Sequence, residues 1–211
     1  MDHANQVVVA ITGASGAIYA RALCRLLAQA GACVHVIVSP HGRELLATEL
    51  GVKELSPAAL LGTAAPTNDV GLAVAPDTVA AGLIRLHDYH DLADPLSSGS
   101  VLTGGMAICP CSSNTLAAVA AGLADNLITR AAHVHLKQRR PLVIVPREMP
   151  VSAIELENQL RLAHAGAIIA PACPGFYQHP QTIDDLAEFV AARIADALGI
   201  HTNAPRYRDL T

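Results

Sequence analysis

The stretch VVVAITGASGAIYA, Val7 to Ala20, decides the fold class, because a short apolar run passes through a glycine-containing loop into helix-forming sequence. Such a junction directs free backbone N–H groups and the positive end of a helix dipole to one point, which suits an anion such as phosphate. Taken alone, the stretch fits a dinucleotide site, a mononucleotide cradle or a plain turn.

Three familiar motifs do not match this stretch. Its glycines are Gly13 and Gly16, whereas the dinucleotide fingerprint requires G-x-G-x-x-G. No lysine follows Gly16, so the phosphate loop of nucleoside triphosphatases is absent. None of the four tyrosines has a lysine four residues on, which argues against a short-chain dehydrogenase. Other parts of the chain must decide between the cradle and the turn.

The rest of the chain alternates apolar runs with stretches of helical period, which predicts an α/β fold with a parallel sheet. The apolar runs lack polar alternation, so each strand is expected to be buried between two layers of helices. The 211 residues fit a single domain, residues 1–211. The expected strands are Val7 to Thr12, Cys33 to Ser39, Gly82 to Leu86, Met106 to Pro110, Leu142 to Pro146 and Ala167 to Pro171.

Helix ends follow from their capping residues. A hydroxyl residue with an acidic residue three positions later makes a capping box, which predicts helices beginning at Ser152 and at Thr182. Asp125 is expected to cap another helix that runs to about Gln138. Residues 51–81 are interrupted by prolines and low in periodicity, so they are interpreted as a variable excursion that is partly helical.

Composition narrows the classes of partner. The net charge of -4 without a dense Lys/Arg run argues against nucleic acid. The apolar runs are far shorter than the roughly 20 residues of a membrane span, and the N-terminus lacks a secretory signal, so a cytoplasmic protein is expected. With 52% hydrophobic and 15% charged residues, a homo-oligomer is expected to cover part of the apolar surface. The five cysteines are expected to be reduced and mostly buried.

Four loops that follow predicted strands carry polar residues, and the carboxyl ends of parallel strands meet at one edge of a sheet. In PCSSNT the serines could donate to a ligand, or Ser112 or Ser113 could simply cap a helix. In PREMP, Arg147 could clamp a phosphate and Glu148 could move a proton, or the two could form a salt bridge at a subunit contact. The loops are 13–17, 110–115, 146–150 and 171–182.

Two histidine-rich segments do not have the spacing of metal ligands. The two histidines His87 and His90 lack the i, i+4 spacing of a helical His pair, so a solvated loop is predicted for them and for Asp88 and Asp91. His133 and His135 lie in helical sequence, where residues two apart face different directions. Cys109 and Cys111 are interpreted as a packed strand end, and no metal is expected.

Together, several strings resemble the UbiX-type flavin prenyltransferases, of the flavoprotein fold. They occur in that family's order and cover nearly the whole chain, except residues 51–81 and the C-terminal tail, residues 200–211. The strings are AITGASGAIYA, SSGS, PCSSNTLAAVAAGLADNLITRAAHV, LKQRRPLVIVPRE, LENQLRLAHAGAIIAPACPGFYQHPQTIDDL and ARIADALGI.

The resemblance implies a Rossmann-like subunit, with a three-layer open parallel sheet, in a homododecamer whose active site lies where subunits meet. It implies that reduced FMN and dimethylallyl monophosphate are joined at flavin N5 and then C6. The product, prenylated FMN, would serve a UbiD-type decarboxylase, and no metal would be required.

The resemblance also implies roles for individual residues. Glu49 and Glu148 would handle protons, with Glu148 the first choice to collect the proton lost on ring formation, and Ser15 would touch the reacting centre. Lys137, Tyr177 and Arg193 would bind the prenyl phosphate. The residues implied to bind FMN are Gly13, Ala14, Ser15, Ser39, Ser112, Ser113, Asn114, Thr115 and Arg147.

Three positions, Asn114, His179 and Tyr207, depart from residues frequent in the family, which puts substrate fit in question more than reaction class. Two alternatives also stay open. One is an FMN-dependent decarboxylase of the peptidyl-cysteine type, which shares the fold. The other is a flavin carrier or assembly subunit without turnover.

Overall fold

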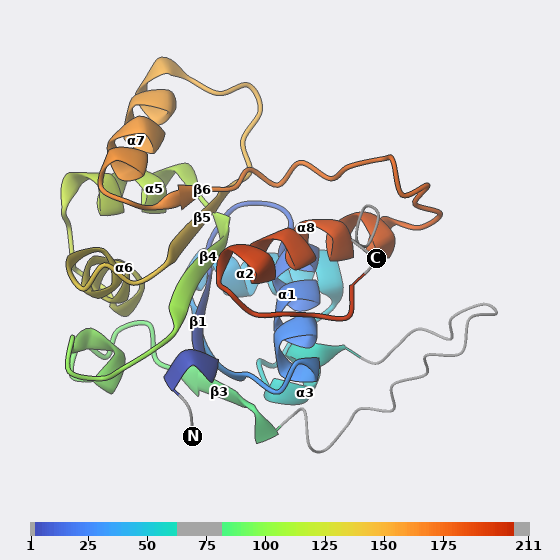
Figure 1. Cartoon of the computed structure of the whole chain (residues 1–211), viewed down its shortest axis with the longest axis horizontal. Helices are drawn as coiled ribbons and strands as arrows, with labels where there is room; N and C mark the ends of the chain where they lie inside the picture. Colours follow the sequence, from blue (N-terminus) through green and yellow to red (C-terminus); the bar gives the residue numbers. More distant parts are fainter. Residues whose placement is uncertain (1–2, 63–81, 205–211) are drawn as a thin grey trace, which may run out of the picture.

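The computed structural model describes residues 3–62 and 82–204. Six parallel strands form one sheet in the order β3-β2-β1-β4-β5-β6 (Figure 1). The predicted Rossmann-like open parallel sheet is therefore confirmed. The strands are β1 Gln6–Ile11, β2 Cys33–Val38, β3 Ile84–His87, β4 Gly105–Cys111, β5 Leu142–Pro146 and β6 Ile168–Ile169.

All six strands lie where the apolar runs predicted them, within about two residues at each end. The sixth is shorter than expected, since only Ile168 and Ile169 pair with β5. Ala170 and Ala172 still donate backbone hydrogen bonds to Ile144 and Pro146. The return bond to the Ala170 carbonyl would have to come from residue 146 of β5, which is a proline without an N–H, and this explains why the ladder is not continuous there.

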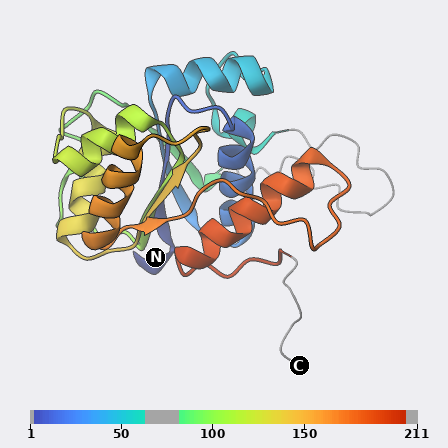
Figure 2. The same cartoon turned by 90° about the horizontal axis from the view of Figure 1, so that it is seen from above.

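Helices cover both faces of the sheet, and Figure 2 shows the three layers from above. The first core lies under α1 and α8 and contains Val7, Val9 and Ile11 of β1. The second lies under α5, α6 and α7 and contains Val8 and Ala10. The helices are α1 Ala17–Gln29, α2 Pro40–Leu50, α3 Pro57–Leu61, α5 Ser113–Ala121, α6 Leu127–Lys137, α7 Ala153–His164 and α8 Ile183–Ala197.

Both predicted capping boxes are present, at Ser152 for α7 and at Thr182 for α8. The prediction for α6 was wrong by one residue, because Asn126 accepts the Thr129 amide as N-cap while Asp125 binds the side chains of Asn126 and Thr129. In the variable excursion, α3 confirms partial helicity, and residues 63–81 lie outside the described part. Residues 205–211 of the C-terminal tail, which include Tyr207, also lie outside the described part.

The prediction of a solvated loop from His87 to Asp91 was partly wrong. Asp88, His90 and Asp91 are exposed. His87 instead is the last residue of β3 and makes two hydrogen bonds. Its Nδ1 lies 2.6 Å from the Asp94 carboxylate, and its Nε2 lies 2.9 Å from Nδ1 of the buried His35. His35 lies on the neighbouring strand β2, so strand pairing brings together histidines 52 residues apart.

The cysteines agree with the expectation of free, mostly buried thiols: four are buried and Cys173 is exposed. Among the described residues, no group of three or more His, Cys, Asp or Glu side chains could hold a metal ion. Within the same residues, no helix is long and apolar enough to cross a membrane.

Candidate active site

The candidate site lies at the carboxyl edge of the sheet, where the strand order reverses between β1 and β4, the usual place for a ligand in such a sheet. Thr12 joins the loops that follow these two strands. Its buried hydroxyl donates to the Pro110 carbonyl at 2.8 Å and accepts the Ser112 amide at 2.8 Å. The sequence reasoning did not single out Thr12, although its place as the first polar residue after a buried strand was a usable signal.

The loop after β1 packs directly on the start of α2. A Cβ at Gly13 would lie 2.6 Å from the His41 Cβ, so any larger residue would push the two segments apart. Ser39 is buried at the end of β2, and its hydroxyl accepts the Gly42 amide at 3.1 Å as the N-cap of α2. Beside Gly13, Ala14 is buried and Ser15 is exposed. Four expected FMN-binding residues therefore lie together around the β1 loop.

Glu49 reaches back from the last turn of α2 to the N-terminus of α1. Its carboxylate accepts the Gly16 amide at 3.0 Å and the Ala17 amide at 2.8 Å. A carboxylate at a helix N-terminus is favoured by the helix dipole and satisfies N–H groups that have no partner within the helix. Glu49 therefore holds the β1 loop, and it occupies the anion position that the sequence alone suggested for a phosphate.

Arg147 follows β5 and lies against the same loop. A Cβ added to Gly16 would lie 2.8 Å from the Tyr19 ring and 4.0 Å from the Arg147 Cγ. The Arg147 Nε is buried without a hydrogen-bond partner among the described residues. Guanidinium nitrogens can only donate, so a buried and unpaired one calls for an acceptor from a ligand.

Tyr19 contributes a neutral hydroxyl beside this guanidinium. Burial raises the pKa of Tyr19, the nearby Cys109 and Cys173 add to the rise, and Arg147 opposes it. The phenol therefore stays protonated at neutral pH and can serve a ligand as donor or acceptor.

The loop after β4 is a helix cap, as the simpler interpretation of PCSSNT predicted. Ser112 accepts the Thr115 amide at 3.3 Å and donates to the Thr115 hydroxyl at 3.0 Å. Asn114 is exposed beside them. Because Ser112 caps the helix with its own hydroxyl, the exposed side chain of Asn114 can still contact a ligand.

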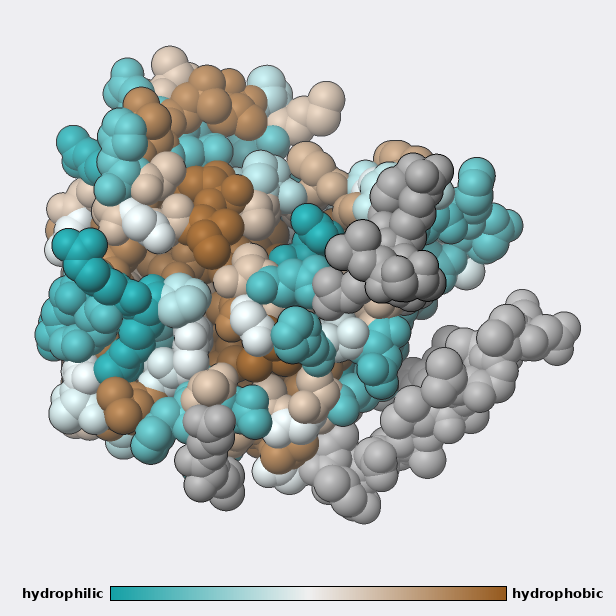
Figure 3. Space-filling view, viewed as in Figure 1, coloured by the Kyte–Doolittle hydropathy of each residue, from teal (hydrophilic) through white to brown (hydrophobic). Residues whose placement is uncertain are grey.

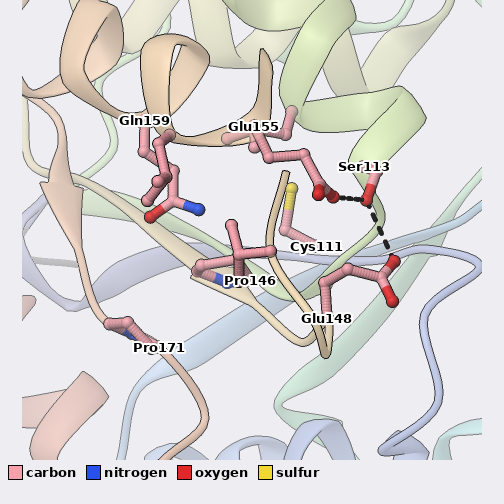
Figure 4. A pocket seen from close by; sticks show the side chains of 10 residues that line it. Cys111, Ser113, Pro146, Glu148, Glu155, Gln159 and Pro171 are labelled. Carbon is pink, nitrogen blue, oxygen red and sulfur yellow. Dashed lines mark hydrogen bonds between the residues drawn. The ribbon is translucent and has the colours of Figure 1, made fainter. Parts of the chain in front are cut away.

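Ser113 points away from the cap and into a pocket between α5 and α7 (Figure 4). Its hydroxyl hydrogen-bonds the carboxylates of Glu148, at 3.1 Å, and Glu155. Glu148 thus does not form a salt bridge with Arg147, the alternative that its sequence neighbour suggested. The sequence reasoning used Glu155 only as a cap, and nothing in its spacing indicated that it would meet Ser113.

Tyr177 and Arg193 lie along one side of α8. The Tyr177 ring, half exposed, meets the Phe189 ring edge to face with centroids 5.6 Å apart. Arg193 lies one helical turn after Phe189, on the same face of α8. Its guanidinium is 68% exposed and 3.5 Å from Asp196. The structure therefore brings these two expected phosphate-binding residues into one neighbourhood.

Lys137 lies elsewhere. It is the last residue of α6, the helix that precedes β5, so it lies toward the amino edge of the sheet, opposite the other expected site residues. Its side chain is exposed. Within one subunit, Lys137 cannot share a ligand with Arg147.

Known proteins resemble this chain in sequence and in fold. The flavoprotein family matches residues 1–195. A protein of Pseudomonas aeruginosa called flavin prenyltransferase UbiX is 46% identical over 201 residues, covering 95% of this chain and 92% of its own. AnUbiX (PadA1), solved in complex with FMN and dimethylallyl pyrophosphate, has a TM-score of 0.79 and 33% identity, with 98% of both chains covered.

A dodecameric FMN-dependent UbiX-like decarboxylase from Escherichia coli O157:H7 has a TM-score of 0.77 and 37% identity, covering 97% of this chain and 100% of its own. The sheet and its carboxyl-edge loops, with the match over residues 1–195, thus define a Rossmann-like flavoprotein subunit. At this level of identity over nearly its whole length, the chain belongs to the flavin prenyltransferase UbiX family. The resemblance seen in the sequence is confirmed.

Proposed function

We propose that this chain is a flavin prenyltransferase that joins the dimethylallyl group of dimethylallyl monophosphate to N5 and C6 of reduced FMN. The product would be prenylated FMN for a UbiD-type decarboxylase. The observation that carries the proposal is the buried, unpaired Nε of Arg147 where the β1 and β5 loops meet. Relatives named flavin prenyltransferase support the reaction class.

The residues around Arg147 fit FMN. Gly13 lets the β1 loop pack on the start of α2, Arg147 offers an unsatisfied donor, and the first turn of α5 presents Asn114 beside its positive end. Reduced FMN supplies the nucleophilic nitrogen, so the protein mainly positions two substrates.

The prenyl phosphate is assigned to Tyr177, Arg193 and Lys137. Departure of phosphate leaves negative charge on its oxygens, and hydroxyl and cationic donors stabilise that charge as it develops. Arg193 is suited to this because its contact with Asp196 is long and exposed, and such contacts are weak. Arg193 can therefore turn to an incoming phosphate.

Lys137 would reach a site only by coming from another subunit. The surface supports assembly: Figure 3 shows apolar residues gathered at the top of the molecule, over α7. Ile154 is 71% exposed there, with Leu156 and Leu160 also exposed. Large apolar side chains exposed along a helix in this way are typical of a surface that other subunits cover. We assign it to a homododecamer, the state described for the Escherichia coli relative.

The five free cysteines fit a reducing compartment, so the cytoplasm is the proposed location. The recipient decarboxylase is inferred from the chemistry of the product alone.

The experiment is anaerobic incubation of the purified protein with reduced FMN and dimethylallyl monophosphate, followed by the mass of the flavin. The proposal expects a mass gain of one dimethylallyl unit. A parallel arm with dimethylallyl pyrophosphate identifies the donor. Flavin-loaded protein that leaves the flavin mass unchanged with both donors would overturn the proposal and favour the carrier alternative. Oxidation of a cysteine-ended peptide instead would favour the decarboxylase alternative.

A further inference from the structure

The pocket between α5 and α7 holds two carboxylates on one hydroxyl. Ser113 Oγ lies 3.1 Å from Glu148 Oε2 and also hydrogen-bonds Glu155 Oε1 (Figure 4). A serine hydroxyl has one proton to donate and lone pairs to accept. It can therefore serve one carboxylate as donor, and it presents a lone pair to the other. The two glutamates are not equivalent.

Glu155 is the one that takes the Ser113 proton. Its second oxygen, Oε2, accepts the Ser152 amide at 2.9 Å and the Ser152 hydroxyl at 3.1 Å. The hydrogen bonds from Ser113 and Ser152 lower the pKa of the Glu155 carboxyl below its ordinary value. Glu155 also lies in the first turn of α7, where the helix dipole favours negative charge.

Glu148 faces the other side of the same hydroxyl. Its Oε1 accepts the Met149 amide at 3.2 Å, so Oε2 is left with the lone pair of Ser113. A protonated Glu148 can donate to it. Cys111, the other titratable group of the lining, stays neutral because burial raises its pKa.

We propose that Glu155 is a positioning residue that acts through Ser113 and makes Glu148 the acceptor of the proton released when the second carbon bond forms. This inference rests on the proposed prenyl transfer. The proton released from N5 when the first bond forms adds to the double bond of the allyl group, and C6 bonds to the tertiary carbon that this leaves electron-poor. The C6–H bond then breaks, its electron pair returns to the ring, and the proton moves to Glu148 Oε2. The new O–H then donates to Ser113 Oγ, which keeps its own proton directed at Glu155.

The test variant is Glu155→Gln, because glutamine keeps the size of the side chain and can still complete a capping box. Its NH₂ group would donate to Ser113, which frees the Ser113 proton for an ionised Glu148 and reverses the polarity of the chain. We expect kcat to fall about tenfold, part of the roughly 100-fold or more that a proton-transfer group supplies. KM for FMN and for the donor should stay unchanged.

A second readout separates this role from a structural one. With FMN deuterated at C6, Glu155→Gln should show a larger kinetic isotope effect than the wild type, and Ser113→Ala should do the same. The matched control is Ser152→Ala, which removes the N-cap hydroxyl of the same helix and its bond to Glu155 Oε2 but keeps the Ser152 amide bond to Glu155 and the Ser113–Glu155 hydrogen bond. It should lower the melting temperature and change kcat and the isotope effect much less than Glu155→Gln does.

Wild-type kcat and isotope effect in Glu155→Gln would overturn the inference. Equal losses of kcat in Ser152→Ala and Glu155→Gln would overturn it as well, because they would show that Glu155 only caps the helix. A wild type that makes no prenylated flavin would instead contradict the proposed function, so the two failures are distinguishable.

Discussion

At the scale of the residue, Arg147 carries most of the functional argument, because its buried Nε has no acceptor among the described residues. A buried donor without an acceptor costs folding free energy, and a bound ligand can remove that cost by accepting the hydrogen bond. The sequence indicated Arg147 by its position after a buried strand. It could not show whether Arg147 pairs with Glu148, since that depends on side-chain directions set by packing.

Arg147→Ala should weaken FMN binding by about 10- to 100-fold, which corresponds to the roughly 1.5–3 kcal/mol of a hydrogen bond to a charged group. Fluorescence titration with FMN measures this. Arg85→Ala, on exposed β3, is the control and should bind as the wild type does. Unchanged affinity in Arg147→Ala would remove Arg147 from the flavin site.

Arg193→Ala should weaken the prenyl donor and spare FMN, because Arg193 lies one helical turn after Phe189, which meets the Tyr177 ring, and is not among the residues assigned to FMN. We expect KM for the donor to rise about tenfold, the loss of one charge-assisted hydrogen bond. Equal loss of affinity for both substrates would show that the assignment is wrong.

Two buried histidines predict a pH dependence of stability. Burial lowers the pKa of His35 from 6.5 to about 4, with the His87 and Arg85 charges adding to the effect, and burial likewise lowers that of His135 to about 4. Between pH 4 and pH 6.5 these two histidines therefore bind more protons in the unfolded chain than in the folded one. The free energy of unfolding should therefore fall as the pH drops from about 6.5 toward 4.

Urea titrations at several pH values measure this dependence. His35→Gln should flatten the slope, whereas His41→Gln, on the exposed face of α2, should leave it as in the wild type. If the free energy of unfolding depends on pH equally in the wild type, His35→Gln and His41→Gln, the buried His35 is not a cause of that dependence.

At the scale of the element, local signals in the sequence gave correct helix starts where the cap is made within the segment itself, as at Ser152 and Thr182. They failed at α6, because both Asp125 and Asn126 are good N-cap residues and only the path of the chain chooses between them. The length of β6 was overestimated for a similar reason, since pairing there depends on what β5 offers.

Thr182→Ala should lower the free energy of unfolding by about 1 kcal/mol, because it removes the acceptor for the Asp185 amide at the start of α8. For a chain of this length that corresponds to about 2–4 °C in Tm. Thr182→Ser keeps the hydroxyl and should remain within a few tenths of a kcal/mol of the wild type. A Ser variant as unstable as the Ala variant would contradict the capping role.

At the scale of the whole molecule, the alternation of strands and helices sufficed for the parallel sheet, and parallel pairing brought the β1, β2, β4 and β5 loops to one edge. The sequence could not show that Lys137 lies at the opposite edge from Arg147, because that follows from the direction of α6. This separation is the strongest structural reason within the chain to expect an active site shared between subunits.

Ile154→Asp should break the assembly, because a charge at the centre of a buried apolar contact is left without a partner. Analytical ultracentrifugation should show a species smaller than the wild type. Lys53→Asp changes an exposed residue between α2 and α3 and should leave the sedimentation coefficient unchanged. An Ile154→Asp protein with wild-type size would show that Ile154 does not lie in an interface.

The most direct measurement is a single anaerobic turnover in which prenylated flavin and released phosphate are counted from the same sample. A flavin prenyltransferase predicts one phosphate released for each flavin that gains a dimethylallyl unit. Phosphate released without a flavin adduct, or flavin-loaded protein that yields neither product, would contradict the account.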